Sequence, residues 1–144
     1  IAIIASYDKG LTFSMVKKSC ALGYYSFGHE IGHTLGAEHD PKYSNNLRFP
    51  DGHGHLIESG NWYYGMRTIL SYSSPGHQLR VNYYSNPKVK HPQTGTPTGV
   101  EGLSDNASVL LRNIDRLASW GNETASCKDK LQGQISNNLQ NCSD

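Results

Sequence analysis

Three histidines and one glutamate occur close together in the sequence, with a spacing that suits metal binding. His29 and His33 are four residues apart, Glu30 directly follows the first, and His39 comes six residues after the second. On an α-helix, side chains four residues apart lie about 40° apart around the axis, so both imidazoles can reach one ion at about 2.0–2.1 Å. The spacing predicts that His29, His33 and His39 bind one metal ion.

Gly36 separates the second histidine from the third. A residue without a Cβ lets the chain turn sharply out of a helix, and this turn would bring His39 back toward the ion. Three protein ligands leave one position open for water and substrate, as in catalytic rather than closed structural zinc sites. Zinc lowers the pKa of such a water toward neutrality, so the carboxylate of Glu30 can accept its proton. We therefore expect one catalytic Zn²⁺ ion and Glu30 as the general base.

Weaker alternatives exist for these and for other histidines. A bare His-Glu-x-x-His occurs by chance on helices of unrelated proteins, but the longer pattern from His29 to His39 fixes five positions and ends the helix where the site requires it. His53 and His55 could form a second metal site, although their glycine-spaced loop offers no third ligand nearby. The remaining histidines lie in predicted loops and receive no role: His77 and His91.

Hydrophobic residues at helical spacing predict the element that carries the first two ligands. They indicate a helix over residues 24–35, with Ser19 or Ser26 in the cap region and Gly36 at its end. The residues of this run are Tyr24, Phe27, Ile31 and Leu35.

A second apolar run predicts a helix over residues 105–120, capped by Ser104 or Asp105 and ending before Gly121. Its stripe is expected to pack into the core and consists of Ala107, Leu110, Leu111, Ile114, Leu117 and Ala118. Elsewhere we expect short strands and loops. The strands fall over 1–6, 11–16 and part of 63–72, and the loops over 40–60 and 85–102.

Composition narrows the classes of function. The 144 residues include 13 lysines and arginines and 12 acidic residues, and neither sign forms a long run. This balance indicates no nucleic-acid footprint and no polybasic membrane patch. The longest apolar stretch, Ile1 to Ala5, is far shorter than a membrane span. The length suits one domain with one core.

Cysteines and glycosylation sequons favour a secreted protein. Cys127 and Cys142 could close a C-terminal loop, which leaves Cys20 to pair outside the chain or remain a free thiol. Three idle thiols are the alternative. The Asn-x-Ser/Thr sequons begin at Asn106, Asn122 and Asn141.

The segment from His29 to His39 resembles the zinc-binding signature of the metzincin metalloendopeptidases, and Asp40 after it resembles the reprolysin (adamalysin) branch. Residues 68–72, Thr-Ile-Leu-Ser-Tyr, are similar to the Met-turn that passes beneath the metal in that clan. Further segments are similar to the end of reprolysin-like catalytic domains, namely 84–87, 95–99 and 105–107. The resemblance covers about residues 1–120.

The sequence departs from that pattern at two points. Leu70 stands where the turn's methionine is expected, Met66 being four residues too early, and a Leu-for-Met exchange usually costs less than about 1.5 kcal/mol. Only 28 residues precede His29, so we expect much of the upstream sheet and of the upper cleft to be missing. Asp40 is expected to accept hydrogen bonds that hold the turn and the third histidine rather than to act in catalysis. In astacins and serralysins the counterpart of Tyr72 reaches the metal. Tyr72 itself is expected to pack instead.

The resemblance implies an α+β, metzincin-like fold. Residues 1–121 would form a partial catalytic domain, with a remnant N-terminal sheet, the zinc helix and a C-terminal subdomain ending in a helix, and 122–144 a polar tail. The implied function is a secreted zinc metalloendopeptidase that cleaves internal bonds of a protein or peptide substrate. An upstream propeptide and N-terminal part of the same precursor would complete it. The alternatives are a non-proteolytic zinc-binding or adhesive module, and zinc acting only as a folding staple.

Overall fold

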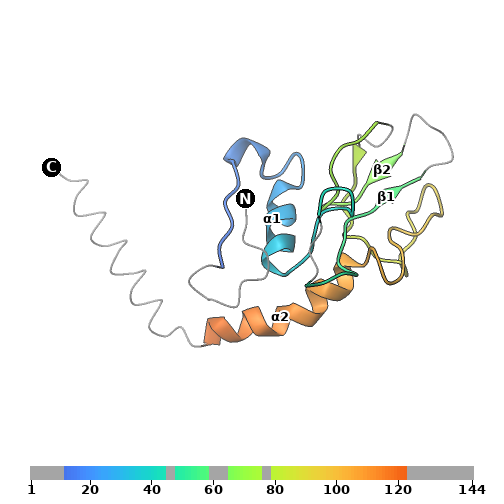
Figure 1. Cartoon of the computed structure of the whole chain (residues 1–144). Coiled ribbons are helices and arrows are strands. Elements are labelled where there is room, and N and C mark those ends of the chain that lie inside the picture. Colours follow the sequence, from blue (N-terminus) through green and yellow to red (C-terminus); the bar gives the residue numbers. More distant parts are fainter. Residues whose placement is uncertain (1–11, 45–47, 59–64, 76–78, 123–144) are drawn as a thin grey trace. The chain divides into compact units, whose positions relative to one another are not determined.

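The computed structural model describes residues 12–44, 48–58, 65–75 and 79–122. Within these residues the strands are short and α2 is the longest of the elements, as Figure 1 shows. In chain order they are η2 (Lys18–Cys20), α1 (Ser26–Thr34), β1 (Leu56–Ile57), β2 (Met66–Arg67), β3 (Leu79–Arg80) and α2 (Asn106–Asn122). The chain divides into two compact units, Ile1–Asn113 and Ile114–Asp144, and the boundary falls within α2.

The strands form one small mixed sheet in the order β1-β2-β3. β1 pairs antiparallel with β2, and β2 pairs parallel with β3, in a register that places Arg67 opposite Arg80. Two helices and a three-stranded sheet confirm the predicted α+β class, whereas the metzincin-like arrangement stays a prediction.

Helix α1 confirms the helix predicted over 24–35, with Leu35 as its C-cap residue. Gly36 follows at φ 99°, a left-handed backbone that glycine adopts without strain, so it ends the helix as predicted. The predicted serine cap is wrong. Ser26 is already the first helical residue, so the N-cap position falls to Tyr25, at φ 54°. Tyr25 makes no side-chain cap hydrogen bond.

Helix α2 begins as predicted but buries a different face. Asp105 caps it by accepting a hydrogen bond from the Ser108 N–H at 3.1 Å. Of the predicted stripe, Leu110 packs against the core, whereas Leu111 is 71% exposed. Val109, which lies outside the stripe, is fully buried, so the predicted core face is wrong in part. The predicted end is also wrong, because α2 runs through Gly121 to Asn122. Asn106 anchors the first turn through its side chain, and this anchor turns residues 106, 109 and 113 inward.

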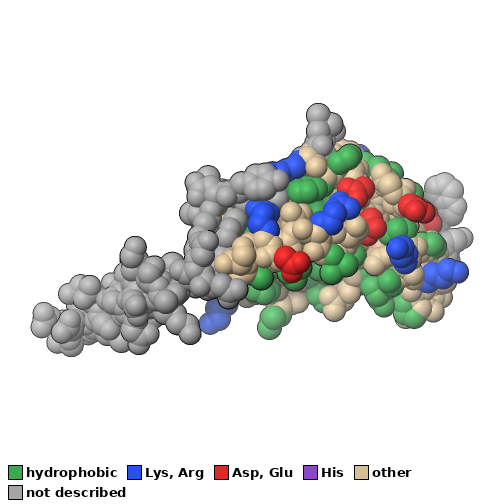
Figure 2. All heavy atoms as spheres, turned by 90° about the horizontal axis from the view of Figure 1, so that it is seen from below, with side chains coloured by type: hydrophobic (Ala, Val, Ile, Leu, Met, Phe, Trp, Pro, Cys, Tyr) green, Lys and Arg blue, Asp and Glu red, His purple; other side chains and the backbone are tan. Residues whose placement is uncertain are grey.

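The hydrophobic core below α1 is small. Ala37, Ile69 and Leu70 form a buried cluster, with Tyr84 and Leu110 packed against it. Among the described residues, buried polar side chains outnumber buried hydrophobic ones, so hydrogen bonds must supply much of the order around α1. Figure 2 shows one face, where acidic and basic side chains lie scattered among hydrophobic ones.

Several other predictions have partial outcomes. Residues 12–16 form no continuous strand, since Ser14 alone makes a β-bridge there. Cys20 is a free cysteine. Asn106 is fully buried in the structure, which leaves no room for a glycan at that sequon. No helix in the described ranges is long and apolar enough to cross a membrane. Other predicted features lie outside the described residues, namely the strand over 1–6, Cys127, Cys142, His77 and the sequon at Asn141.

Candidate metal centre

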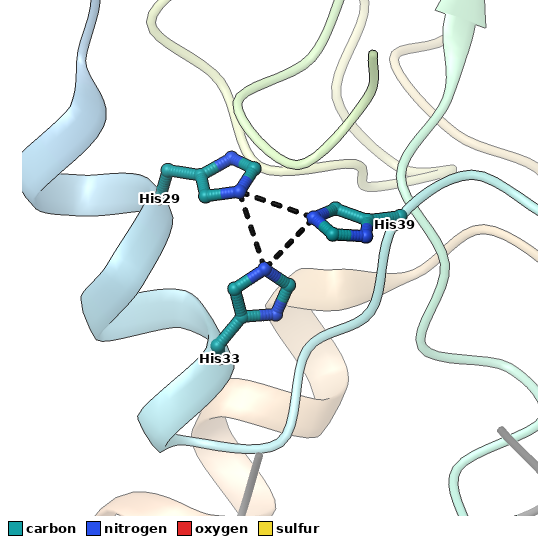
Figure 3. A group of neighbouring side chains, drawn as sticks. All are labelled: His29, His33 and His39. Carbon is teal, nitrogen blue, oxygen red and sulfur yellow. Dashed lines mark hydrogen bonds between the residues drawn. The ribbon is translucent and has the colours of Figure 1, made fainter. Parts of the chain in front are cut away.

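The three predicted ligands come together at one point. Figure 3 shows His29 and His33 projecting from α1 toward His39, which lies on the segment after the Gly36 turn. Their Nε2 atoms are separated by 3.2 Å for His29 and His33, 2.9 Å for His33 and His39, and 3.2 Å for His29 and His39. Two tetrahedral ligands at about 2.0–2.1 Å from an ion lie about 3.3 Å apart, so the triad could hold one metal ion.

The other ring nitrogens explain which tautomers are present. His29 Nδ1–H donates to the carbonyl oxygen of Ile69 at 2.8 Å, and His33 Nδ1–H donates to that of Ala37 at 2.8 Å. In the neutral rings the two Nε2 atoms then carry lone pairs that face each other. Such an arrangement is repulsive unless a cation lies between the nitrogens, so the donor set fits a metal.

Burial keeps the rings of His29 and His39 neutral. It lowers the pKa of His29 to about 4, although the hydrogen bond to Ile69 opposes the shift and the charge of His33 adds to it. Burial likewise lowers the pKa of His39 to about 3, with further lowering by His33 and His29. The Nε2 lone pairs of His29 and His39 are therefore available at neutral pH.

His39 is positioned by a second segment of chain. The backbones of Glu38 and Gly52 are joined by an N–H···O bond of 2.7 Å, and Gly54 N–H donates to the Glu38 carbonyl at 2.9 Å. His53 Nδ1–H donates to the backbone carbonyl of His39 at 2.9 Å. Within the described residues, His29, His33 and His39 form a potential metal cluster that includes neither His53 nor His55. His53 thus supports the third histidine.

The predicted turn at residues 68–72 passes beneath α1. Ser71 N–H donates to the Thr68 carbonyl at 3.1 Å, which closes the turn, and Leu70 between them is fully buried. A Cβ on Gly32 would lie 2.8 Å from Leu70 Cδ2, so leucine fills the space below the helix at that point. Leu70 therefore serves as the hydrophobic base of the site.

Two residues around this turn behave differently from each other. Asp40 is buried and its Oδ2 accepts the Tyr72 N–H at 3.0 Å, which confirms that it holds the turn. The Tyr72 ring packs on His39, with 4.2 Å between ring centroids, and also contacts Tyr43 edge-on. Tyr72 therefore packs at the surface of the site rather than in the core, since 42% of it is exposed.

Glu30 lies on α1 beside the triad, and its carboxylate is close enough to raise the pKa of His39. The same carboxylate acts on Arg80, a half-buried residue for which the sequence predicted no role. No sequence signal could have found Arg80, because β3 brings it to the site through pairing with β2.

The chain is similar to curated metalloendopeptidases from bacteria. It is 38% identical over 108 residues to the peptidyl-Asp metalloendopeptidase of Xanthomonas campestris pv. campestris, which covers 75% of this chain and 24% of that protein. The protein of the same name from Stenotrophomonas maltophilia is 38% identical over 109 residues, covering 75% of this chain and 25% of that protein. That of Pseudomonas fragi is 40% identical over 72 residues, or 50% of this chain and 48% of that protein.

The chain thus spans about a quarter of the length of the first two relatives. No protein-family model matches it, and no solved structure matches it.

Proposed function

We propose that this protein is a zinc-dependent metalloendopeptidase, with His29, His33 and His39 as the metal ligands and Glu30 as the general base. The observation that carries the proposal is the convergence of three Nε2 atoms, two of which keep their lone pairs free because Nδ1 donates elsewhere. The names of the similar bacterial proteins support a metalloendopeptidase. A donor set of three imidazoles is one that zinc commonly takes in catalytic sites.

Zinc, when bound, would polarise the peptide carbonyl and make water acidic enough to lose a proton near neutral pH. The carboxylate of Glu30 accepts that proton as the water attacks the carbonyl carbon, and then delivers it to the nitrogen of the leaving amine. Because Glu30 is adjacent to His29 on α1, the helix holds the base beside the metal ligands. Ile69 and Ala37 hold the rings through their carbonyls and keep the ligand nitrogens in the reactive tautomer.

The substrate follows from the relatives. They are named peptidyl-Asp metalloendopeptidases, so we propose that this protein cleaves proteins beside aspartate residues.

Elemental analysis and a peptidase assay test the metal and the activity together. We expect one zinc ion per chain and cleavage of Asp-containing peptides that a chelator abolishes and added zinc restores. One bound zinc without peptidase activity would instead favour the non-proteolytic zinc-binding module.

The Glu30→Gln variant tests the base. Removing a general base typically lowers the rate by about 10²–10⁴-fold, so kcat should fall by that amount while zinc stays bound. Glu101→Gln, at an exposed turn, is the matched control and should keep full activity. Full activity of Glu30→Gln would show that another group is the base.

A further inference from the structure

A hollow of about 330 Å³ lies beside Arg80. Its wall includes Tyr25, at the start of α1, together with Tyr83, His91 and Gln93. None of the described residues that line it is acidic, so its only formal charge comes from the arginine.

Arg80 enters this hollow because of the sheet. Parallel pairing of β2 with β3 places it next to Arg67. Burial, and after it the charge of Arg67, lowers the pKa of the Arg80 guanidinium to about 10. One Nη atom donates to the Tyr24 carbonyl at 2.9 Å, which holds the guanidinium at the beginning of the catalytic helix. Its Nε–H is buried and has no hydrogen-bond partner. A buried, unpaired donor on a cation is costly unless a ligand completes it.

Arg80 also lies close to the reacting groups. Its charge interacts with the carboxylate of Glu30 and with the rings of His29 and His39. Because its hydrogen-bond partner, the Tyr24 carbonyl, lies two residues before α1, a substrate group bound by this guanidinium would lie near the N-terminal end of the helix that carries Glu30.

His91 adds a second unpaired polar atom to the same wall. Its side chain is only 5% exposed, and its Nδ1 is buried without a partner. The ring stands edge-on to Tyr83, with 5.8 Å between centroids, so it is held in place. The hollow thus holds two unpaired polar atoms and no acidic residue in its described lining. The Arg80 Nε–H, and the His91 Nδ1 in the tautomer that carries a proton there, can donate to an anion.

We infer that this hollow binds the aspartate side chain of the substrate and that Arg80 is the residue that selects it. The inference rests on the proposed endopeptidase function and deepens it. A guanidinium pairs with a carboxylate through parallel N–H···O bonds, whereas the neutral amide of asparagine leaves part of that donor set unpaired. The preference for aspartate over asparagine thus comes from the cost of leaving guanidinium donors unpaired when asparagine is bound.

Two peptides that differ only by Asp or Asn at one position test this assignment. In Arg80→Met, kcat/KM for the Asp peptide should fall by roughly 10- to 100-fold, while that for the Asn peptide changes less than about threefold. Arg80→Lys keeps the charge without the fork and should give an intermediate Asp/Asn ratio. Arg112→Met, which removes an arginine that forms an exposed ion pair with Asp51, is the matched control and should leave the ratio unchanged.

A binding measurement separates this inference from the proposed function. In a Glu30→Gln background, fluorescence anisotropy of labelled Asp and Asn peptides should show a preference for Asp that Arg80→Met removes. Loss of both peptides in equal proportion by Arg80→Met would overturn the assignment and make Arg80 a charge partner of Glu30. If Arg80→Met does not fold, the Asp/Asn ratio of Arg80→Lys decides, and an unchanged ratio overturns the inference. If the parent protein cleaves neither peptide, the proposed function fails, while the binding preference still judges Arg80.

Discussion

Helix α1 and the first two turns of α2 both bury polar side chains, but the amide N–H groups of α2 are paired with carbonyls of the chain, whereas ring nitrogens of α1 converge on one point. In α2, the Asn106 amide donates to the Gly52 carbonyl, and the Asn113 amide donates to the Val109 carbonyl at 3.0 Å. In α1, His29 and His33 use one ring nitrogen for the protein and direct the other at a shared point. Buried groups paired within the chain stabilise the fold, whereas buried groups that converge without a counter-charge indicate a ligand.

Removing a converging ligand should have the largest effect. His33→Ala should weaken zinc binding by more than about 100-fold, because even residues that merely orient metal ligands contribute about 10–100-fold. Zinc titration against a competing chelator measures this. His53→Ala is the control, since the His53 ring donates to the backbone carbonyl of His39 and is not one of the three converging ligands, and it should lose much less affinity. Equal losses in the two variants would remove the distinction between ligand and support.

Substitution of a paired amide in α2 should lower the stability of the fold and leave metal binding unchanged. Asn106→Ala removes the buried amide that donates to the Gly52 and Glu38 carbonyls. At about 0.5–1.5 kcal/mol for each hydrogen bond, the free energy of unfolding should fall by about 1–3 kcal/mol. Urea unfolding checks the loss, and elemental analysis should still find one zinc per folded chain. Loss of zinc from folded Asn106→Ala would show that the two helices are not functionally distinct.

The buried face of α2 can be tested with a pair of truncations. Val109→Ala should cost about 1–3 kcal/mol, because it removes two buried methyl groups and leaves a cavity beside Gly52. Leu111→Ala should stay within about 0.5 kcal/mol, because Leu111 is 71% exposed. The reverse order of the two unfolding free energies would restore the stripe expected from the sequence.

The effect that is smallest at neutral pH, and grows as the pH falls, should come from the titration of His29 and His39 in metal-free protein. Well above pH 6.5, His29 and His39 are neutral in both the folded and the unfolded chain, so their titration contributes nothing to the free energy of unfolding there. As the pH falls from 6.5 toward 4, the unfolded chain binds protons that buried His29 and His39 refuse, so the free energy of unfolding should decrease. Urea unfolding at pH 7.5, 6 and 5 tests this, and His29→Asn should reduce the slope. A slope of the opposite sign would contradict the burial of these rings.

The accuracy of the sequence predictions differs between these regions for a physical reason. The helix over 24–35, the Gly36 turn and the meeting of His29 with His33 follow from local geometry, which a single segment specifies. The face of α2 depends on which loop carbonyls lie near Asn106, and hydrophobic spacing alone carries no such information. The helix was therefore predicted correctly and its stripe only in part, since Leu110 packs against the core and Leu111 is exposed.

By itself, the sequence determined the type and spacing of the three histidines, the glutamate beside the first and the glycine that turns the chain toward the third. These are properties of one short segment, and helix periodicity translates them directly into a common focus. Only the tertiary structure decided that Leu70 fills the space under Gly32, that His53 supports His39, and that Arg80 donates to the Tyr24 carbonyl before α1. Those contacts join residues far apart in the chain, and strand register and packing rather than spacing bring them together.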